Sequence, residues 1–323
     1  MTAKPLVVSC GEPAGIGPEI AAKAWDQLRQ DLPFAWIGDP QHLPHGIPIA
    51  KISNPAEAMH VSADALPVVS LDFGGPSKPG LPDPSQAKHV VAAITRGVEF
   101  CKSNKAGALV TGPISKKALI DGAGFAFPGH TEFLADLVGV SRTVMMLAGP
   151  DLRVVPATIH IPLCDVPRVL NEALLVETVE IVARDLQRSF GIEAPRICVS
   201  GLNPHAGEGG AMGREEIEVI SPAIETLKRL GHTVFGPLPA DTMFHERARS
   251  SYDVAVCMYH DQALVPLKTL AFDEGVNVTL GLPFVRTSPD HGTAFDIAGQ
   301  DRADPTSMVA ALRMAADMAK ARA

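Results

Sequence analysis

Three histidines share one local pattern, in which an apolar run rich in Val and Ile ends shortly before the imidazole. His160 closes VVPATIH, His205 closes ICVSGLNPH and His260 closes DVAVCMYH. Three neutral imidazole nitrogens can bind one divalent ion at about 2.0–2.1 Å and leave its other coordination positions to water or substrate. The pattern favours a catalytic metal site, although each histidine taken singly is also compatible with a solvated loop residue.

Carboxylates accompany these histidines in the sequence. Asp241 lies in PLPADTMF, Asp261 directly follows His260, and Asp290 stands beside His291. A carboxylate can orient an imidazole or an ammonium group and relay a proton to it. Asp261 has an alternative role, because DQALVPLK is typical of a helix start, where Asp caps the helix.

Basic residues next to Gly, Ser and Thr predict an anion site. They occur in TGPISKK (Thr111–Lys117), in GHTE (Gly129–Glu132), at Lys268 and in RTSPDHG (Arg286–Gly292). Such groups combine positive charge with directional donors, which suits a phosphorylated or carboxylated substrate. Lys116 and Lys117 are equally compatible with an exposed helix start. Arg286 follows a covered apolar run, where an unpaired guanidinium is unfavourable, so we expect an anion partner there.

The elements that must position these residues are short apolar runs alternating with amphipathic stretches, which predicts an α/β fold with parallel strands. Predicted strands are Pro5–Cys10, Phe34–Gly38, Gly107–Thr111, Thr143–Leu147, Val154–His160, Arg196–Leu202, Asp253–Tyr259 and Val276–Leu280. Predicted helices are Pro18–Arg29, Ser85–Asn104, Ala173–Phe190, Arg214–Leu230 and Pro305–Ala321. Ligands of such folds gather at the carboxyl ends of the strands, where the three histidines would meet.

Two Gly-rich segments have structural interpretations. The first turn, GEPAGIGPE, lies between a strand and a helix but fails the dinucleotide fingerprint, because Ile20 takes the place of the third Gly and Glu19 would repel a pyrophosphate. We therefore expect Gly11, Gly15 and Gly17 to permit tight turning and close packing. The Gly- and Pro-rich segment Gly74–Gln86 predicts an ordered loop or an interdomain connection.

Composition excludes several classes of protein. The 323 residues are 46% apolar and 20% charged, which is typical of a globular chain. The net charge of −8 opposes general nucleic-acid binding, and no apolar run has the about 20 residues that cross a membrane. The N-terminus lacks a signal-peptide pattern, so a cytoplasmic location is expected. The five cysteines show no C-x-x-C spacing and predict buried thiols.

Taken together, seven motifs resemble the 4-hydroxythreonine-4-phosphate dehydrogenase family of vitamin B6 biosynthesis. They span the chain in order from Gly11 to Gly299: GEPAGIGPE, TGPISKKAL, GHTEFLA, NPHAGEGG, GPLPADTMF, MYHDQALVPLK and GVNVTLGLPFVRTSPDHGTAFDIAG. The resemblance implies an isocitrate/isopropylmalate-dehydrogenase-like two-domain α/β/α architecture with an active-site cleft between the domains. It also implies a homodimer whose active sites take residues from both subunits. The domains are expected at 1–130 plus 290–323 and at 131–289.

The resemblance also assigns residues and cofactors. It implies His160, His205 and His260 as metal ligands, and His130, Thr131, Lys268, Asn277 and Arg286 as substrate contacts. Asp241, Asp261 and Lys268 are expected to act in catalysis. The implied reaction is the oxidation by NAD of the C3 hydroxyl of 4-phosphooxy-L-threonine, followed by loss of CO2 to give 3-amino-2-oxopropyl phosphate. NADP is the alternative cofactor, and zinc, magnesium or cobalt is the expected divalent metal.

Three other functions are compatible with the same residues. A dehydrogenase of the same family could oxidise 4-phospho-D-threonate or erythronate. A metal-dependent phosphohydrolase could use the three histidines to activate water, and would release phosphate without NADH. A non-catalytic metabolite-binding module would show neither metal uptake nor turnover. The expected partners are therefore a small phosphorylated substrate and a second copy of the chain, not nucleic acid or membrane.

Overall fold

The structure, a computed structural model, describes residues 4–323 and divides into two compact units. The first unit comprises Met1–Ser141 and Leu282–Ala323, and the second comprises Arg142–Gly281. The sequence placed these boundaries near residues 130 and 290, so the second unit is shorter at both ends than expected. The predicted α/β class is confirmed, because helices and strands alternate along each unit.

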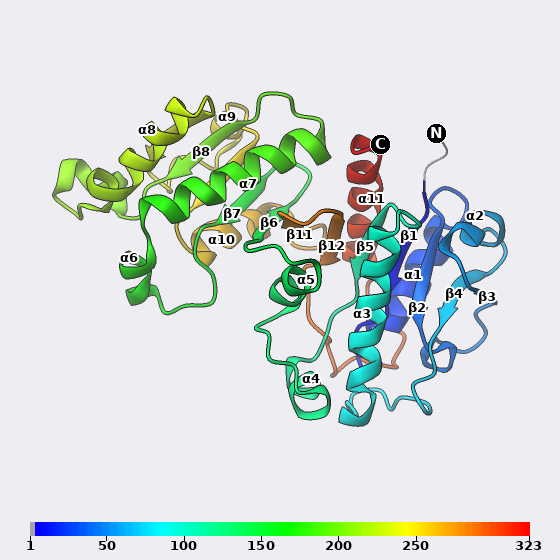
Figure 1. Ribbon diagram of the computed structural model, residues 1–323. Coiled ribbons are helices and arrows are strands. Elements are labelled where there is room, and N and C mark those ends of the chain that lie inside the picture. The colour runs from blue at the N-terminus through cyan, green and yellow to red at the C-terminus, as the bar shows by residue number, and fades with distance from the viewer. Residues whose placement is uncertain (1–3) are drawn as a thin grey trace. The chain divides into compact units, whose positions relative to one another are not determined.

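The described part of the first unit is built on a parallel sheet with the strand order β3-β4-β2-β1-β5-β12. Its strands are β1 (Leu6–Ser9), β2 (Phe34–Gly38), β3 (Ile49–Ile52), β4 (Leu66–Ser70), β5 (Ala108–Thr111) and β12 (Val285–Pro289). Its helices are α1 (Gly17–Leu28), α2 (Ala58–Val61), α3 (Ala87–Lys102), α4 (Lys116–Ala123), α5 (His130–Val138) and α11 (Thr306–Ala321). Helix α3 packs on one face, and α1 and α11 lie on the other (Figure 1).

The second unit has the strand order β11-β6-β7-β10-β8-β9, in which β6 runs antiparallel to both of its neighbours and the strands from β7 to β9 are parallel. Its strands are β6 (Val144–Ala148), β7 (Arg153–Pro156), β8 (Arg196–Ser200), β9 (Thr233–Leu238), β10 (Val254–Cys257) and β11 (Val276–Leu280). Its helices are α6 (Val166–Val169), α7 (Glu172–Phe190), α8 (Ser221–Arg229), α9 (Glu246–Arg249) and α10 (His260–Leu270). Helices α7 and α10 cover opposite faces (Figure 1).

Strands covered on both faces were predictable because they are continuous apolar runs. Every residue of β1, β2 and β10 is buried. Four strands were missed: β3, β4, β9 and β12. Only one residue of β3 is buried. Strand β12 reads VRTSP, a polar sequence that is nevertheless fully buried. Periodicity detects apolar side chains, so a buried strand with polar contents gives no signal.

Several local expectations were corrected. The expected helix over residues 214–230 is a π-helical turn, Glu216–Ile220, followed by α8. Segment Gly74–Gln86 connects β4 to α3 within the first unit, so it is an ordered loop and not an interdomain connection. Three cysteines are buried, but Cys164 is exposed.

The first turn is shaped by close backbone contact, as its glycines predicted. A Cβ atom on Gly11, whose φ is +71°, would lie 2.4 Å from the Pro113 carbonyl oxygen, and one on Gly17 would lie 2.6 Å from that of Cys10. Glu19 forms an ion pair with Lys23 at 2.9 Å and accepts a hydrogen bond from the Ala303 N–H at 2.8 Å. The turn is therefore a packing device.

Helix α7 fixes both ends of the second unit. Arg142, the first residue of the second unit, donates to the Thr178 hydroxyl of α7 at 2.9 Å and forms an ion pair with Glu177 of α7 at 3.1 Å. Gly281, the last residue of the second unit, donates its N–H to the buried Asp185 of α7 at 2.6 Å. A Cβ atom on Gly281 would lie 2.9 Å from the Arg142 carbonyl oxygen, so the two ends of the unit touch.

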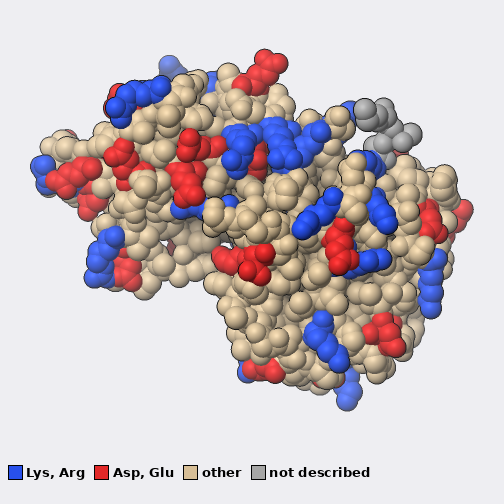
Figure 2. Space-filling model, in the orientation of Figure 1, with Lys and Arg blue, Asp and Glu red and all other residues tan. Residues whose placement is uncertain are grey.

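The surface carries both signs of charge. Figure 2 shows basic and acidic side chains interspersed over the visible face of each unit. Among residues 4–323, none of the helices combines the length and the apolar character needed to span a membrane.

Candidate active site

The three strand-associated histidines follow three adjacent parallel strands of the second unit. His160 follows β7, His260 follows β10 and His205 follows β8, and the sheet order places β10 between the other two. All three histidines therefore follow the carboxyl ends of neighbouring parallel strands, at one edge of this sheet.

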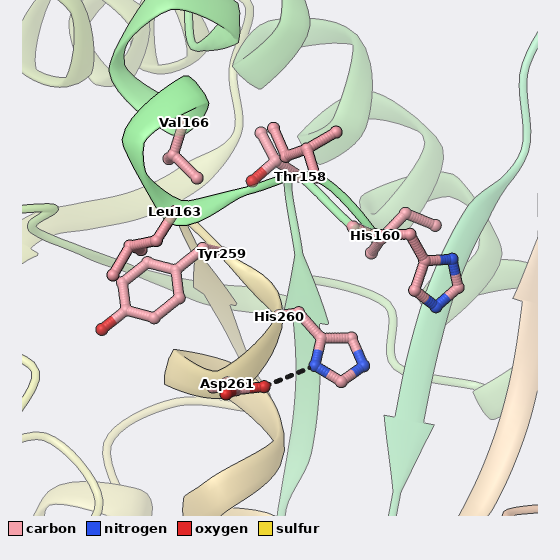
Figure 3. Close-up of a pocket in the computed structure, with 9 residues that line it drawn as sticks. Thr158, His160, Leu163, Val166, Tyr259, His260 and Asp261 are labelled. Atoms are coloured by element: carbon pink, nitrogen blue, oxygen red, sulfur yellow. Dashed lines mark hydrogen bonds and ion pairs between the residues drawn. The ribbon is translucent and has the colours of Figure 1, made fainter.

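His160 and His260 lie side by side because the chain segments leading to them remain paired beyond the strands. The N–H groups of Ala157 and Thr158 donate to the carbonyl oxygens of Cys257 and Met258 at 2.8 and 3.2 Å. The Thr158 hydroxyl also donates to the Met258 carbonyl at 2.7 Å. The imidazole centroids lie 5.7 Å apart with an interplanar angle of 40°, and Figure 3 shows both rings on one side of the pocket.

Asp261 orients His260 and does not cap the helix. Its Oδ1 lies 2.7 Å from His260 Nδ1, as the dashed line in Figure 3 marks, while the N-cap position of α10 is Tyr259. With Nδ1 engaged by a carboxylate, Nε2 is the ring nitrogen left to bind a ligand. This is the arrangement in which proteins present histidine to metal ions.

His205 stands apart from this pair on an unusual turn. Residues His205–Gly209 all have positive φ values, between +46° and +80°, so the chain forms a left-handed turn. Three of them are not glycine, and this conformation costs each such residue about 1–3 kcal/mol. His205 Nδ1 lies 2.8 Å from Glu208 Oε2, and the His205 side chain is 61% exposed. His160 also has a positive φ, +55°.

The donor set fits a divalent ion only in part within one chain. In the described residues, no group of three His, Cys, Asp or Glu side chains could hold one ion. His160 and His260 have a spacing compatible with two rings that bind one ion. His205 and His260 each have Nδ1 next to a carboxylate, as metal-binding imidazoles do. Within one chain, His160 and His260 could therefore supply two ligands to a metal ion, and His205 is a third imidazole that lies apart from them.

A hollow of about 260 Å³ adjoins the paired histidines. Its polar groups are those of Thr158, Tyr259 and Asp261, and its apolar wall comprises Ile161, Leu163 and Val166, as Figure 3 shows for the labelled residues. Leu163 is 64% exposed. His160 is exposed and the His260 side chain is 36% exposed, so both imidazoles are accessible to solvent.

Other expected residues of the second unit take separate positions. Lys268 lies on α10, two turns beyond His260, and its Nζ is 5.7 Å from the Phe272 ring centroid. Asn277 lies in β11, and its buried Oδ1 has no hydrogen-bond partner within the described chain. Asp241 is exposed in the loop after β9.

The first unit holds the expected anion-binding residues on regular structure. Arg286 lies within β12, not beyond a strand as the sequence suggested, and only 2% of it is exposed. Its Nη2 donates to the Thr111 hydroxyl on β5 at 2.6 Å. Burial lowers the pKa of Arg286 to about 9. A buried cation of this kind favours an anionic ligand.

His130 and Thr131 begin helix α5 in the same unit. Gly129, the N-cap residue, provides no side-chain cap, so the first N–H groups of α5 have no cap acceptor there. Burial and the charges of Arg286 and Lys116 hold the pKa of His130 well below its usual value. Its Nε2 is buried and has no hydrogen-bond partner in the described residues. Lys116, as expected for a helix start, is exposed at the first position of α4.

Sequence reasoning missed two polar residues that build the second unit's site. Gln262 accepts from the Ser200 hydroxyl and the Met258 N–H at 2.8 and 2.7 Å, and donates to the Gly201 carbonyl at 2.8 Å. It therefore ties the end of β8 to the end of β10. The other is Glu216, which contacts the loop before His205. Gln262 stands inside the motif MYHDQ, so its position beside His260 was the available signal.

The second unit carries two neighbouring imidazoles and the first unit carries the buried Arg286. On an α/β fold, these groups are typical of an enzyme that binds a small anionic substrate. Known proteins narrow this class. The family model described as pyridoxal phosphate biosynthetic protein PdxA matches residues 30–315. A 4-hydroxythreonine-4-phosphate dehydrogenase of Ruegeria sp. (strain TM1040) is 62% identical over 100% of this chain and 99% of its own length. The chain belongs to the PdxA family.

Solved structures agree with this assignment. A 4-hydroxythreonine-4-phosphate dehydrogenase from Klebsiella pneumoniae matches with a TM-score of 0.88 and 36% identity over 98% of both chains. A terephthalate 1,2-cis-dihydrodiol dehydrogenase from Burkholderia xenovorans LB400 matches with a TM-score of 0.68 and 28% identity over 98% of both chains. The same fold thus carries dehydrogenases named for different substrates.

Proposed function

We propose that this protein oxidises 4-phosphooxy-L-threonine at C3 with NAD and that the product loses CO2 to give 3-amino-2-oxopropyl phosphate, a step of pyridoxal phosphate formation. The main support is the full-length similarity to relatives named for this dehydrogenase activity. The buried guanidinium of Arg286 in the first unit also suits a phosphorylated substrate.

The proposed reaction has two steps, an oxidation at C3 and a decarboxylation that leaves C2 to be protonated. A hydride leaves C3 for the nicotinamide and the C3 hydroxyl loses its proton, so C3 becomes a ketone. The ketone is β to the carboxylate, which leaves as CO2, and C2 then gains a proton. A bound divalent ion would lower the pKa of the hydroxyl and stabilise the enolate that forms on decarboxylation. The chain must therefore bind the anionic end, orient the hydroxyl and supply proton-transfer groups.

The proposal assigns these tasks to named residues. Arg286, His130 and Thr131 bind the phosphate or carboxylate, with Asn277 and Lys268 as further contacts. His160, His205 and His260 hold the divalent ion, and Asp261 keeps His260 in the binding tautomer. Lys268 and Asp241 remain the proposed proton-transfer groups.

The arrangement of the histidines supports a homodimer with shared sites. Among the described residues of one chain, His160 and His260 lie side by side, whereas His205 lies on a separate turn and is exposed. We propose that His205 completes the site of a second copy.

The activity test combines purified protein, NAD, a divalent ion and 4-phosphooxy-L-threonine. NADH absorbance should rise with the release of CO2. The same assay with 4-phospho-D-threonate and erythronate tests the nearest alternative substrates, and phosphate release without NADH would replace the proposal with a phosphohydrolase.

Mixing two variants tests the shared site. His205→Ala and His260→Ala should each be inactive alone. In a mixed dimer, one site would combine intact His160 and His260 with the other copy's His205. Unfolding and refolding the two together should recover roughly a quarter of wild-type activity if chains pair at random. No recovery, with mixed dimers demonstrated by mass spectrometry, would contradict the shared site.

A further inference from the structure

A buried carboxylate, Glu216, supports the turn that carries His205. Glu216 lies in the π-helical turn and is only 3% exposed. Its Oε1 accepts from the backbone N–H groups of Leu202 and Asn203 at 2.8 and 2.7 Å. Its Oε2 accepts from the Asn203 side-chain amide at 3.0 Å. One carboxylate thus binds two consecutive residues just before the left-handed turn.

Two glycines make room for this carboxylate. A Cβ atom on Gly201 would lie 3.0 Å from Glu216 Oε1, and one on Gly207 would lie 2.6 Å from Oε2. Gly207 is itself the middle residue of the left-handed turn, with φ of +80°. The carboxylate therefore packs against both the segment that enters the turn and the turn itself.

Hydrogen bonding keeps Glu216 ionised. Burial raises the pKa of Glu216, but the hydrogen bonds from Asn203 and Leu202 outweigh it, and the pKa lies below its usual value. Charge-assisted bonds to backbone N–H groups are stronger than neutral ones. A strained turn persists only where its surroundings over-determine it.

We propose that Glu216 is a positioning residue for His205: its carboxylate holds the left-handed turn, within which Glu208 orients the imidazole, so that Nε2 is presented to the divalent ion. This proposal rests on the proposed role of His205 as a metal ligand. Glu216 itself does not touch the metal or the substrate. The π-helical turn supplies the local widening that such turns commonly provide at functional sites.

The test is a Co²⁺ titration of the metal-free protein, followed by the visible absorbance of the bound ion. Glu216→Gln keeps one acceptor oxygen but loses the charge and should weaken Co²⁺ binding about 10–100-fold, as loss of a supporting partner does. In a His205→Ala background, Glu216→Gln should produce no further weakening, because its effect passes through His205. Glu218→Gln is the matched control, since Glu218 lies on the same π-helical turn and is exposed in a pair with Arg214.

The outcomes separate the two proposals. If His205→Ala leaves the Co²⁺ affinity unchanged, the ligand assignment itself is wrong. If His205→Ala weakens binding but Glu216→Gln does not, or if the two effects add, Glu216 is not a positioning residue for His205. A spectrum of bound Co²⁺ that is the same in wild type and Glu216→Gln would contradict the positioning role in the same way.

A second variant covers the case in which Glu216→Gln does not fold. Gly207→Ala retains the carboxylate but places a methyl group against it, and should weaken Co²⁺ binding in the same direction. Amide hydrogen exchange of the metal-free protein supplies a readout independent of metal. In Gly207→Ala, exchange should accelerate in residues 201–213 and stay unchanged in α7. Unaltered exchange in that segment, with unaltered Co²⁺ binding, would overturn the proposal.

Discussion

The two units keep their polar functional groups in opposite ways. In the first unit, Arg286 is built into a strand and is 2% exposed, and His130 begins a helix with its Nε2 buried. In the second unit, the imidazoles of His205 and His260 are 61% and 36% exposed and follow strands on loops or at a helix start. Burial lowers the pKa values of Arg286 and His130 in the first unit. In the second unit, neighbouring carboxylates contact the imidazoles of His205 and His260 and orient them.

This difference follows from what each set must bind. A buried guanidinium is costly without compensating partners, so a buried arginine favours an anionic ligand over a neutral one. An imidazole that binds a metal must be neutral, correctly oriented and reachable, which solvent exposure and a carboxylate partner provide. The comparison predicts that changes in the second unit act on metal binding and changes in the first on substrate binding.

The largest effect should come from His260→Ala. The substitution removes one of the two imidazoles that lie side by side. Loss of a group that only supports a metal ligand weakens metal binding by up to about 100-fold, so loss of the ligand itself should lower Co²⁺ affinity by more than that. Equilibrium dialysis with Co²⁺ measures this directly. If His260→Ala lowers substrate affinity and leaves Co²⁺ affinity unchanged, the assignment of metal binding to the second unit is wrong.

Arg286→Met should weaken substrate binding, the task assigned to the first unit, and leave metal binding unchanged. Loss of the buried charge should lower kcat/KM about 100-fold, mainly through KM, because a charge-assisted contact to the anionic substrate is lost. Arg286→Lys should recover only part of this loss, since lysine lacks the planar fork of arginine. Co²⁺ titration of both variants is the control, and weakened metal binding would contradict the division of tasks.

Asp261→Asn sharpens the role of carboxylates in the second unit. The amide cannot supply the negative charge next to His260 Nδ1, so Co²⁺ affinity should fall about 10–100-fold. Asp273→Asn, an exposed change beyond the end of α10, is the control. Equal affinities for wild type and Asp261→Asn would show that the hydrogen bond does not prepare the imidazole.

The smallest effect concerns the stability of the first unit at acidic pH. The pKa of His130 is lowered on folding, so just below pH 6.5 the unfolded chain binds more protons than the folded one. Stability from this group is present above pH 6.5 and is lost as the pH falls. His130→Gln should therefore flatten the acid side of the thermal unfolding profile.

The control for this profile is His45→Gln, a change at an exposed histidine of the same unit. Unfolding temperatures measured from about pH 5 to about pH 8 cover the relevant range. An acid limb that is equally steep in wild type and His130→Gln would show that burial of this imidazole has no effect on stability.

The sequence predicted the parts of the molecule that depend on local patterns. Apolar runs located β2 and β11 at their observed bounds, and helix periodicity located α1, α3, α7 and α11 closely. The strand-end position of the histidines also followed from the pattern, because parallel strands align their carboxyl ends.

The remaining parts depend on contacts between distant residues. β12 was missed because its buried polar side chains are satisfied by tertiary partners, such as Thr111 for Arg286. Gln262 and Glu216 resembled ordinary surface residues in the sequence, but their carbonyl and carboxylate oxygens bind backbone groups of other segments. The left-handed turn at His205 was not predictable either, since three of its residues are not glycine.

The contact between Arg142 and Gly281, both tied to α7, makes the second unit an insert with neighbouring ends. An excised chain of residues 142–281 would need only a short linker to join its ends, and closing so small a gap carries little entropic penalty. Such an architecture allows the histidine-bearing part to be transplanted, circularised or evolved as a cassette. The host chain around it would keep its own continuous sheet of strands from both termini.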